Sequence, residues 1–263
     1  MFTIAYKYDI INYAAMKRYV MLNIVCLKWG DKYGPEYVNR LYNMCAQFYT
    51  NPFTFYCATD NQIGIKSEIN ILDLKEFEVA DGQWGGKVFT AEKIKLLNHF
   101  ETKTLLLDLD ILILSDVTEY VDSVFLEDKP CFIRNEWADQ DNIKRNYGKI
   151  TCDVNSSFVI GNKQSTANLN DKLFSSNYDY YSLKYRSLDK TLFYRFLSII
   201  KFHDDKKLVY SFNGGASWPE DMEKGKYRPE YKVCLFNNSH GEGDDIHDSN
   251  TNWAIEYWES FDD

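Results

Sequence analysis

Two aspartates separated by one leucine, Asp108 and Asp110, lie within an apolar stretch that runs from Thr104 to Leu114. A continuous apolar run predicts a strand buried on both faces, as in the parallel sheets of α/β proteins. Residues i and i+2 of a strand point the same way, so both carboxylates can converge on one point. Buried carboxylates need compensation, and paired acidic oxygens suit magnesium or manganese. The stretch therefore predicts a metal site that holds a diphosphate, at the sheet edge where open α/β folds bind ligands.

Two other interpretations of this stretch stay open. An aspartate that follows a strand can cap a turn without any role in binding. Haloacid-dehalogenase-type phosphatases also carry Asp-x-Asp after an apolar strand, with the first aspartate, here Asp108, as the nucleophile. In this sequence Ile111 and Leu112 follow the pair, where that family has a turn of small residues. The phosphatase is therefore the second hypothesis, with Asp244 and Asp245 as its further metal ligands.

The composition limits the classes of protein to consider. The chain has 263 residues, 45% of them hydrophobic, and a formal charge of −9, which suits one large α/β domain. The acidic balance argues against nucleic acid or an anionic membrane as the partner. No apolar run has the length of a membrane span, and residues 1–20 do not resemble a signal peptide. Six scattered cysteines without a Cys-x-x-Cys pair favour reduced thiols and a cytoplasmic protein.

The order of the expected elements indicates strand–helix–strand units and a parallel sheet. We treat residues 1–20 as an N-terminal arm and 21–263 as one domain. The expected strands cover residues 21–27, 53–58, 69–74, 104–114, 130–137, 154–160, 209–212 and 231–236. The expected helices cover residues 35–49, 89–100, 116–121, 165–175, 188–200 and 253–258.

Several motifs, taken in their order along the chain, resemble the GT-A fold glycosyltransferases that use nucleotide-diphosphate sugars, within them the family 8 and glycogenin-like group. The motifs are Lys-Trp-Gly after the first strand, Thr-Asp after the second, a lysine-bearing helix, Asp-x-Asp, Asn-Ser, Leu-Asp and a late His-Gly. The resemblance covers most of the chain, from Met21 to Trp258. It implies a Rossmann-like α/β domain with a central, mostly parallel sheet flanked by helices.

The resemblance also implies an activity. Such enzymes transfer a sugar from a UDP-sugar donor to an acceptor hydroxyl, with Mn²⁺ or Mg²⁺ as the cofactor. The acceptor, whether a glycan, a protein or a small molecule, stays unnamed. Because so many tyrosines and tryptophans could stack on sugars, a sugar-binding protein without catalysis is the third hypothesis.

The nucleoside side of the expected donor site comes from the early motifs. By resemblance, Cys26, Leu27 and Lys28 at the end of the first strand match the positions that hold the nucleoside. Asp60 matches the acidic residue that contacts the base, and Lys93 resembles the lysine of the glycogenin-like helix. These residues are expected to bind the donor.

The reacting side comes from the later motifs. Asn155 and Ser156 resemble the segment that touches the donor sugar, and Asp189 resembles the aspartate of the family's Asp-Gln pair. We expect Asn155 and Asp189 to be catalytic. Leu109, between the two metal-binding aspartates, is expected to contact the donor as well.

The third metal ligand is expected from the late His-Gly. The resemblance implies that His240 completes the site with Asp108 and Asp110. An octahedral cation has room for one more protein ligand, and imidazole suits manganese. His240 follows an apolar strand closely, and Gly241 lets the backbone approach a phosphate. His247 is the competing candidate.

Two departures from the family pattern bear on the mechanism. Acidic residues, beginning with Glu242, follow the His-Gly where the family has a lysine, and Lys190 replaces the glutamine of Asp-Gln. The resemblance therefore supports the reaction class better than its stereochemistry. Retention of the anomeric configuration is expected by analogy alone.

Overall fold

The computed structural model describes residues 21–77, 91–135, 152–175, 177–212, 225–236, 246 and 252–262. Among these residues, no helix is long and apolar enough to span a bilayer. The expected arm, residues 1–20, lies outside the described residues. All six cysteines are described and none forms a disulfide, as their scattered positions predict.

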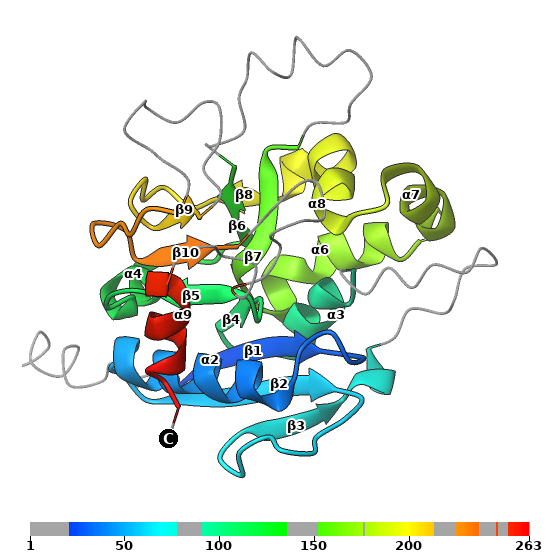
Figure 1. The fold of residues 1–263 in the computed structure, drawn as a ribbon. Coiled ribbons are helices and arrows are strands. Elements are labelled where there is room, and N and C mark those ends of the chain that lie inside the picture. Colours follow the sequence, from blue (N-terminus) through cyan, green and yellow to red (C-terminus); the bar gives the residue numbers. More distant parts are fainter. Residues whose placement is uncertain are drawn as a thin grey trace, which may run out of the picture.

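Seven of the described strands form a central sheet in the order β3-β2-β1-β4-β7-β6-β8 (Figure 1). Strands β3, β2, β1 and β4 run parallel, while β7 is antiparallel to both β4 and β6. This arrangement confirms the predicted α/β class with a mostly parallel central sheet. The strands are β1 (Leu22–Lys28), β2 (Phe53–Thr59), β3 (Asn70–Asp73), β4 (Thr104–Leu107), β6 (Cys131–Arg134), β7 (Val154–Gly161) and β8 (Lys201–Phe202).

The helices begin where the local sequence favours them. Pro35 is the first residue of α2, where its missing N–H costs nothing. Asn162 caps α6 and exchanges hydrogen bonds with Ser165 in a capping box. The helices are α2 (Pro35–Phe48), α3 (Glu92–His99), α4 (Thr118–Ser123), α6 (Lys163–Leu173), α7 (Tyr178–Tyr185), α8 (Leu188–Thr191) and α9 (Asn252–Glu259). Short turns of other helix types are η1 (Leu74–Glu76), η3 (Leu192–Phe196) and η4 (Leu197–Ile199).

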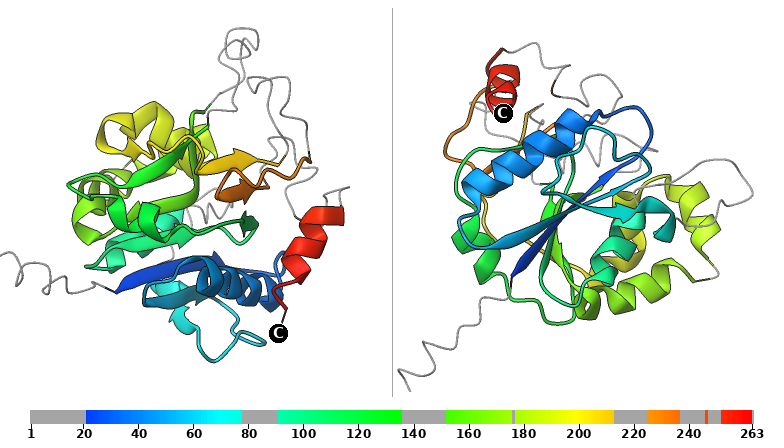
Figure 2. Two further views of the ribbon diagram at one scale, coloured as in Figure 1. Left: turned by 90° about the vertical axis from the view of Figure 1, so that its left-hand side faces the viewer. Right: turned by 90° about the horizontal axis from the view of Figure 1, so that it is seen from below.

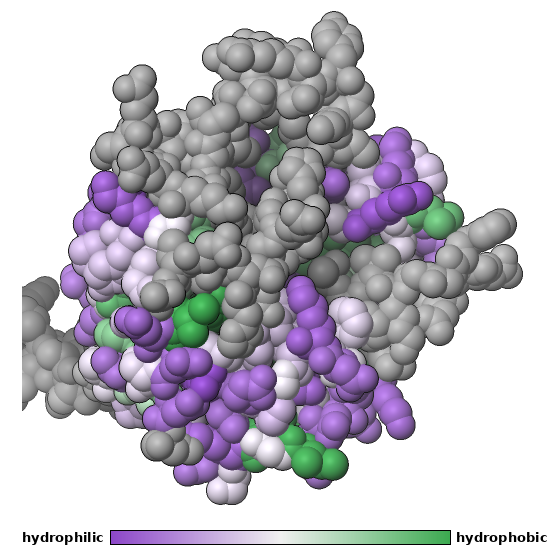
Figure 3. All heavy atoms as spheres, in the orientation of Figure 1, coloured by the Kyte–Doolittle hydropathy of each residue, from purple (hydrophilic) through white to green (hydrophobic). Residues whose placement is uncertain are grey.

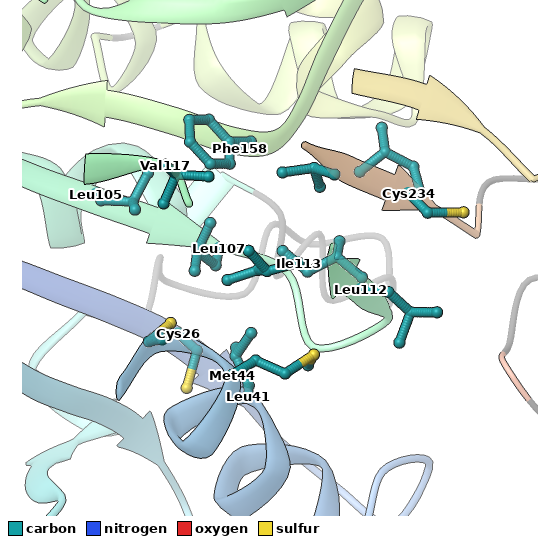
Figure 4. Packing of buried hydrophobic residues seen from close by; sticks show 14 of the residues in the cluster. Cys26, Leu41, Met44, Leu105, Leu107, Leu112, Ile113, Val117, Phe158 and Cys234 are labelled. Atoms are coloured by element: carbon teal, nitrogen blue, oxygen red, sulfur yellow. The ribbon is translucent and has the colours of Figure 1, made fainter. Parts of the chain in front are cut away.

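Strand β4 is buried on both of its faces, as its apolar run predicts. Leu105 and Leu107 pack into one core with α2 and α9 (Figure 4). Leu106, which points the other way, packs into a second core with α3, α6 and α7. Figure 2 shows α2 on one side of the sheet and α3 with α6 on the other. Burial of both faces holds the carboxyl end of β4 in a fixed position.

The run from Thr104 to Leu114 is not one strand, which corrects the sequence-based expectation. Strand β4 ends at Leu107, and the chain bends at Leu109 and Asp110. The second half of the run, β5 (Ile111–Ile113), belongs to a separate small sheet in the order β5-β10-β9. There it pairs antiparallel with β10 (Val233–Leu235), which pairs parallel with β9 (Val209–Ser211). Both halves are apolar because each is buried in its own sheet.

Two helical segments also differ from the expectation. Helix α7 was not predicted, because Tyr180 and Leu183 lie off the face of its buried tyrosines and its sequence shows only a weak apolar stripe of helical period. The helix expected over residues 188–200 is divided into α8, the π-helical turn η3 and the 3₁₀ turn η4. Its apolar residues still face the second core, where Leu188, Leu192 and Phe196 are buried.

Where it is described, the face in Figure 3 is mainly hydrophilic, with hydrophobic side chains in small separate groups. Among the described residues, the most exposed large hydrophobic side chains are Ile63 and Phe125, which are far apart in the sequence. Isolated side chains of this kind are normal on a globular protein and indicate no particular partner.

Candidate active site

The carboxyl ends of three parallel strands meet at one edge of the central sheet. Lys28, the last residue of β1, is in register with Thr59, the last residue of β2. Just beyond them, the Gly30 N–H donates to Oδ2 of Asp60 at 3.1 Å and joins the loops after the two strands. Asp108 follows β4 directly, and its N–H donates to the Ser157 carbonyl of β7 at 3.0 Å. Asp60 and Asp108 therefore lie at the edge that was predicted for ligand binding.

Lys93 lies at the centre of this site. The side chain of this lysine, on helix α3, is 7% exposed. Its Nζ lies 2.5 Å from Oδ1 of Asp108. The same Nζ donates to the carbonyl of Ser156 at 3.2 Å and to its Oγ at 3.3 Å. Burial alone would lower the pKa of Lys93, but Asp108, Asp189 and Asp110 raise it above its ordinary value. The side chain is therefore an ammonium group in the folded protein.

Asp110, at the bend after β4, is the second carboxyl group of the site. Burial, together with the neighbouring Asp108 carboxylate, raises the pKa of Asp110 to about 7. Two neighbours act in the opposite direction and lower the pKa of Asp110. The Tyr33 hydroxyl donates to its Oδ2 at 3.1 Å, and the positive charge of Lys93 has a smaller effect. A second cation near Asp110 would lower its pKa again.

Asp189, on the short helix α8, completes a group of three carboxyl groups around Lys93. Burial raises the pKa of Asp189 to about 6, against the lowering effect of Lys93 and of hydrogen bonds from Ser156. Within the described part of the molecule, Oδ1 of Asp189 is buried without a hydrogen-bond partner. A buried carboxylate oxygen of this kind normally meets a ligand or water.

Strand β7 carries two of the expected site residues, of which Ser156 contacts Lys93. Asn155 and Ser156 are both buried, and Oδ1 of Asn155 accepts a hydrogen bond from the Ser157 N–H at 2.9 Å. The Ser156 hydroxyl and carbonyl accept from Lys93, while Ser156 donates to Asp189. Ser156 therefore connects helix α3 to helix α8 across the strand.

Some of the expected donor contacts face away from this group. Cys26 is fully buried in the first core, and Leu109 is 3% exposed in the same core. Leu27 packs against the second core, and the Nζ of Lys28 lies 3.5 Å from the Gly30 carbonyl. The side chains of Cys26 and Leu109 point into the interior, so a ligand at this edge would meet the backbone of these residues.

The late His-Gly falls outside the described residues. His240, Gly241 and the competing His247 therefore stay predictions. The described chain approaches them at Phe236, whose N–H donates to the Asp110 carbonyl at 3.4 Å. His240 comes four residues after Phe236 in the sequence.

The described side chains fit a divalent cation in part. In the described ranges, no group of three or more His, Cys, Asp or Glu side chains is arranged to hold a metal alone. Asp108 and Asp110 supply two carboxylates that are close enough for one to raise the pKa of the other. Such a concentration of negative charge suits a hard cation that takes oxygen ligands. Any further ligands must come from a bound diphosphate, water or residues outside those described.

Tyr33 is a site residue that the sequence analysis did not identify. It lies in the loop between β1 and α2, where its ring contacts that of Tyr37 with centroids 4.8 Å apart. The Nζ of Lys32 lies 4.7 Å from the centre of the Tyr33 ring. In a chain with 20 tyrosines, nothing in the local sequence separates this one from the others. Its role depends on the fold, which brings the loop to Asp110.

The central sheet, its two layers of helices and the second small sheet define a class of fold. No model of a protein family matches the sequence, and no curated protein matches it either. Solved structures of glycosyltransferases do match, and they show that this chain has the GT-A fold of those enzymes. The predicted resemblance in fold is confirmed.

The individual matches have low sequence identity. An active-site mutant of LgtC superposes with a TM-score of 0.58 at 14% identity, over 90% of this chain and 94% of that chain. The apo form of the glycosyltransferase GlyE of Streptococcus pneumoniae TIGR4 gives 0.57 at 13% identity, over 92% and 60%. The bifunctional glycosyltransferase WbbM gives 0.55 at 13% identity, over 91% and 51%. Another structure of LgtC, a galactosyltransferase, holds donor and acceptor sugar analogs.

Proposed function

We propose that this protein is a metal-dependent glycosyltransferase that moves a sugar from a UDP-sugar donor to an acceptor hydroxyl. The observation that carries the proposal is the group of Asp108, Asp110, Asp189 and Lys93 at the carboxyl edge of a GT-A sheet. Ligands of open α/β sheets bind at this edge. A buried lysine can pair with the negative charge of a phosphate, and the acidic residues around it can bind a metal ion.

Each group has a distinct part in the proposed reaction. Asp108 and Asp110 would hold Mn²⁺ or Mg²⁺, which when bound would neutralise the diphosphate and favour its departure. Lys93 would face the phosphates as a second positive charge. Asp189 and Asn155 would orient the donor sugar at its reacting carbon. Oδ1 of Asp189, which has no hydrogen-bond partner among the described residues, is available for a sugar hydroxyl. His240 is proposed as the third protein ligand of the metal.

Retention of the anomeric configuration is part of the proposal and rests on the family resemblance. An NMR assignment of the product formed from a donor of known configuration tests it. A product of opposite configuration would end the analogy with family 8 and leave the proposal of sugar transfer intact.

Calorimetric titration of UDP in the presence of Mn²⁺ tests the proposed donor site. We expect binding by the wild type, and its loss in Asp108→Asn and Asp110→Asn, because each change removes a ligand charge at nearly constant volume. Asp171→Asn, a matched change at an exposed position of α6, should bind as the wild type does. Circular dichroism would show that all three variants are folded.

Measurements on the wild type and on these variants also distinguish the glycosyltransferase from the two alternative functions. If Asp108→Asn or Asp110→Asn binds Mn²⁺ and UDP like the wild type, the metal site does not lie here. Hydrolysis of a generic phosphate ester that needs Asp108, without binding of UDP, would favour the phosphatase. Binding of UDP and sugar without any release of UDP from a donor would favour a sugar-binding protein without catalysis.

A further inference from the structure

The ammonium group of Lys93 makes every hydrogen bond that it can make. It has three N–H donors, and three acceptors lie within reach: Oδ1 of Asp108 and the carbonyl and Oγ of Ser156. Lys93 is nearly inaccessible to solvent, while the Asp108 side chain is 26% exposed. One oxygen of an expected metal ligand is therefore engaged by a cation that belongs to the protein itself.

We propose that Lys93 is an internal counter-ion, which occupies Asp108 in the empty site and releases it when a divalent cation binds together with a diphosphate. This inference rests on the proposed function, because it assumes that the metal and the diphosphate bind at Asp108 and Asp110. It adds a consequence: the metal alone should bind weakly, and the nucleotide should raise its affinity.

The competition follows from charge and geometry. Oδ1 of Asp108 lies 2.5 Å from the ammonium nitrogen, so a metal on that oxygen would stand next to a buried positive charge. Like charges at such separations repel strongly in a partly buried site. A metal that takes this oxygen must therefore displace the ammonium from Asp108, and the displaced ammonium loses its strongest hydrogen bond.

A diphosphate removes this penalty. Its oxygens bring negative charge to the same edge of the sheet and can accept the hydrogen bond that Asp108 gives up. Ser156 keeps the lysine in place during the exchange, because its two contacts with Nζ do not involve Asp108. Metal and diphosphate are then coupled ligands, each of which raises the affinity of the other by the same factor.

The test is a pair of titrations with Mn²⁺, one without and one with saturating UDP, followed by calorimetry and by the EPR signal of free Mn²⁺. Lys93→Met removes the charge and keeps a long side chain. We expect it to bind Mn²⁺ alone about tenfold more tightly than the wild type, which corresponds to one charge-assisted hydrogen bond. The gain in Mn²⁺ affinity on adding UDP should become smaller by a similar factor.

Two further variants control the experiment. Lys93→Arg keeps the positive charge and should keep the weak binding of Mn²⁺ alone. Lys95→Met makes the same change on the same helix, where the lysine lies 5.1 Å from the centre of the Phe174 ring, and should behave like the wild type. If Lys93→Met does not fold, Lys93→Gln, which can still bond to Ser156, replaces it in the same titrations.

The possible results distinguish this inference from the proposed function. Unchanged or weaker binding of Mn²⁺ alone by Lys93→Met, with normal binding of Mn²⁺ and UDP by the wild type, would overturn the inference only. Absence of Mn²⁺ binding in the wild type, with and without UDP, would overturn both. Tighter binding of Mn²⁺ alone together with reduced coupling to UDP would establish Lys93 as the counter-ion.

Discussion

Three carboxyl groups meet in the candidate site, and the structure compensates each of them in a different way. Asp108 has a direct ion pair with Lys93, Asp110 has a hydrogen bond from Tyr33, and Asp189 has hydrogen bonds from Ser156. Burial, the largest cause, holds the pKa of Asp110 and that of Asp189 above the ordinary range, and the nearby Lys93 does not offset it. A cation bound here would stabilise the charged forms of these carboxyl groups.

Asp189→Asn should separate binding from catalysis. Oδ1 of Asp189 is buried without a protein partner among the described residues, so the change removes charge where a donor sugar is expected. We expect binding of UDP and Mn²⁺ to stay within about threefold of the wild type. Turnover should fall by about a hundredfold or more, because a misplaced reacting group costs about that factor. Release of UDP from a donor sugar measures the turnover. Asp179→Asn, on the exposed side of α7, is the control, and full turnover by Asp189→Asn would remove this residue from the mechanism.

His240 and His247 can be ranked by substitution. We expect His240→Ala to weaken binding of Mn²⁺ with UDP by about tenfold or more, because a lost metal ligand costs at least that much. His247→Ala should cost much less, since no predicted strand or glycine brings it to the sheet edge. Calorimetric titration of both variants measures the difference, and the reverse order would move the assignment from His240 to His247.

The junction of α4, β7 and β8 is held by a histidine outside the site. The Nδ1 of His203 lies 2.8 Å from the Tyr120 hydroxyl, and its Nε2 lies 3.2 Å from the Phe158 carbonyl. Because Phe158 accepts, Nε2 carries the proton and the Tyr120 hydroxyl donates to Nδ1. Burial lowers the pKa of His203 to about 4, so the ring is neutral at neutral pH.

Neutral His203 should make stability fall as the pH is lowered. The unfolded chain takes up this proton below its ordinary pKa of about 6.5, while the folded chain does not until about pH 4. The free energy of unfolding should therefore fall between pH 7 and pH 4, by up to about 3 kcal/mol from this group. Urea unfolding of the wild type and of His203→Gln measures it.

The wild type must be compared with His203→Gln because other groups also titrate between about pH 7 and pH 4. Asp110 and Asp189, with raised pKa values, stabilise the folded protein as the pH falls and act in the opposite direction. These contributions are common to both proteins and cancel in the difference. If His203→Gln shows the same pH dependence as the wild type, His203 does not titrate as described.

The first core joins both ends of the described chain. Helix α9 packs beside α2 (Figure 2). Arg40 of α2 forms an ion pair with Asp262 and lies over the Trp258 ring at 3.8 Å. The Asn43 amide donates to the Phe261 carbonyl at 2.7 Å. These contacts connect the last described residues to the helix that follows β1.

Removal of residues 1–20 should therefore leave the molecule nearly unchanged. The segment has no motif and no periodic apolar face in its sequence, and β1 begins at Leu22. We expect the melting temperature of the shortened protein to stay within about 2 °C of the full chain, which corresponds to at most about 1 kcal/mol. UDP binding should not change. A large loss of soluble protein on truncation would show that the segment packs on the domain.

Local patterns in the sequence predict much of this fold, because burial on one or both faces leaves a period in the residue types. The apolar runs of β1, β2 and β7, the amphipathic stripe of α2 and the position of Asp108 after a buried strand could all be predicted. The acidic pair was predicted from residue type and spacing, and the lysine of α3 and Asp189 were identified as candidates through the family resemblance.

The tertiary structure decided which of these residues meet and how. The run from Thr104 to Leu114 is equally apolar throughout, so only the pairing of its halves with β7 and with β10 divides it between two sheets. Contact of Lys93 with Asp108 needs α3 to pack against the sheet, and the bond from Tyr33 needs the loop after β1 to lie beside β5. The partners in these two contacts are 15 and 77 positions apart. A single sequence has no local signal for such pairs, because they are fixed by strand register and packing.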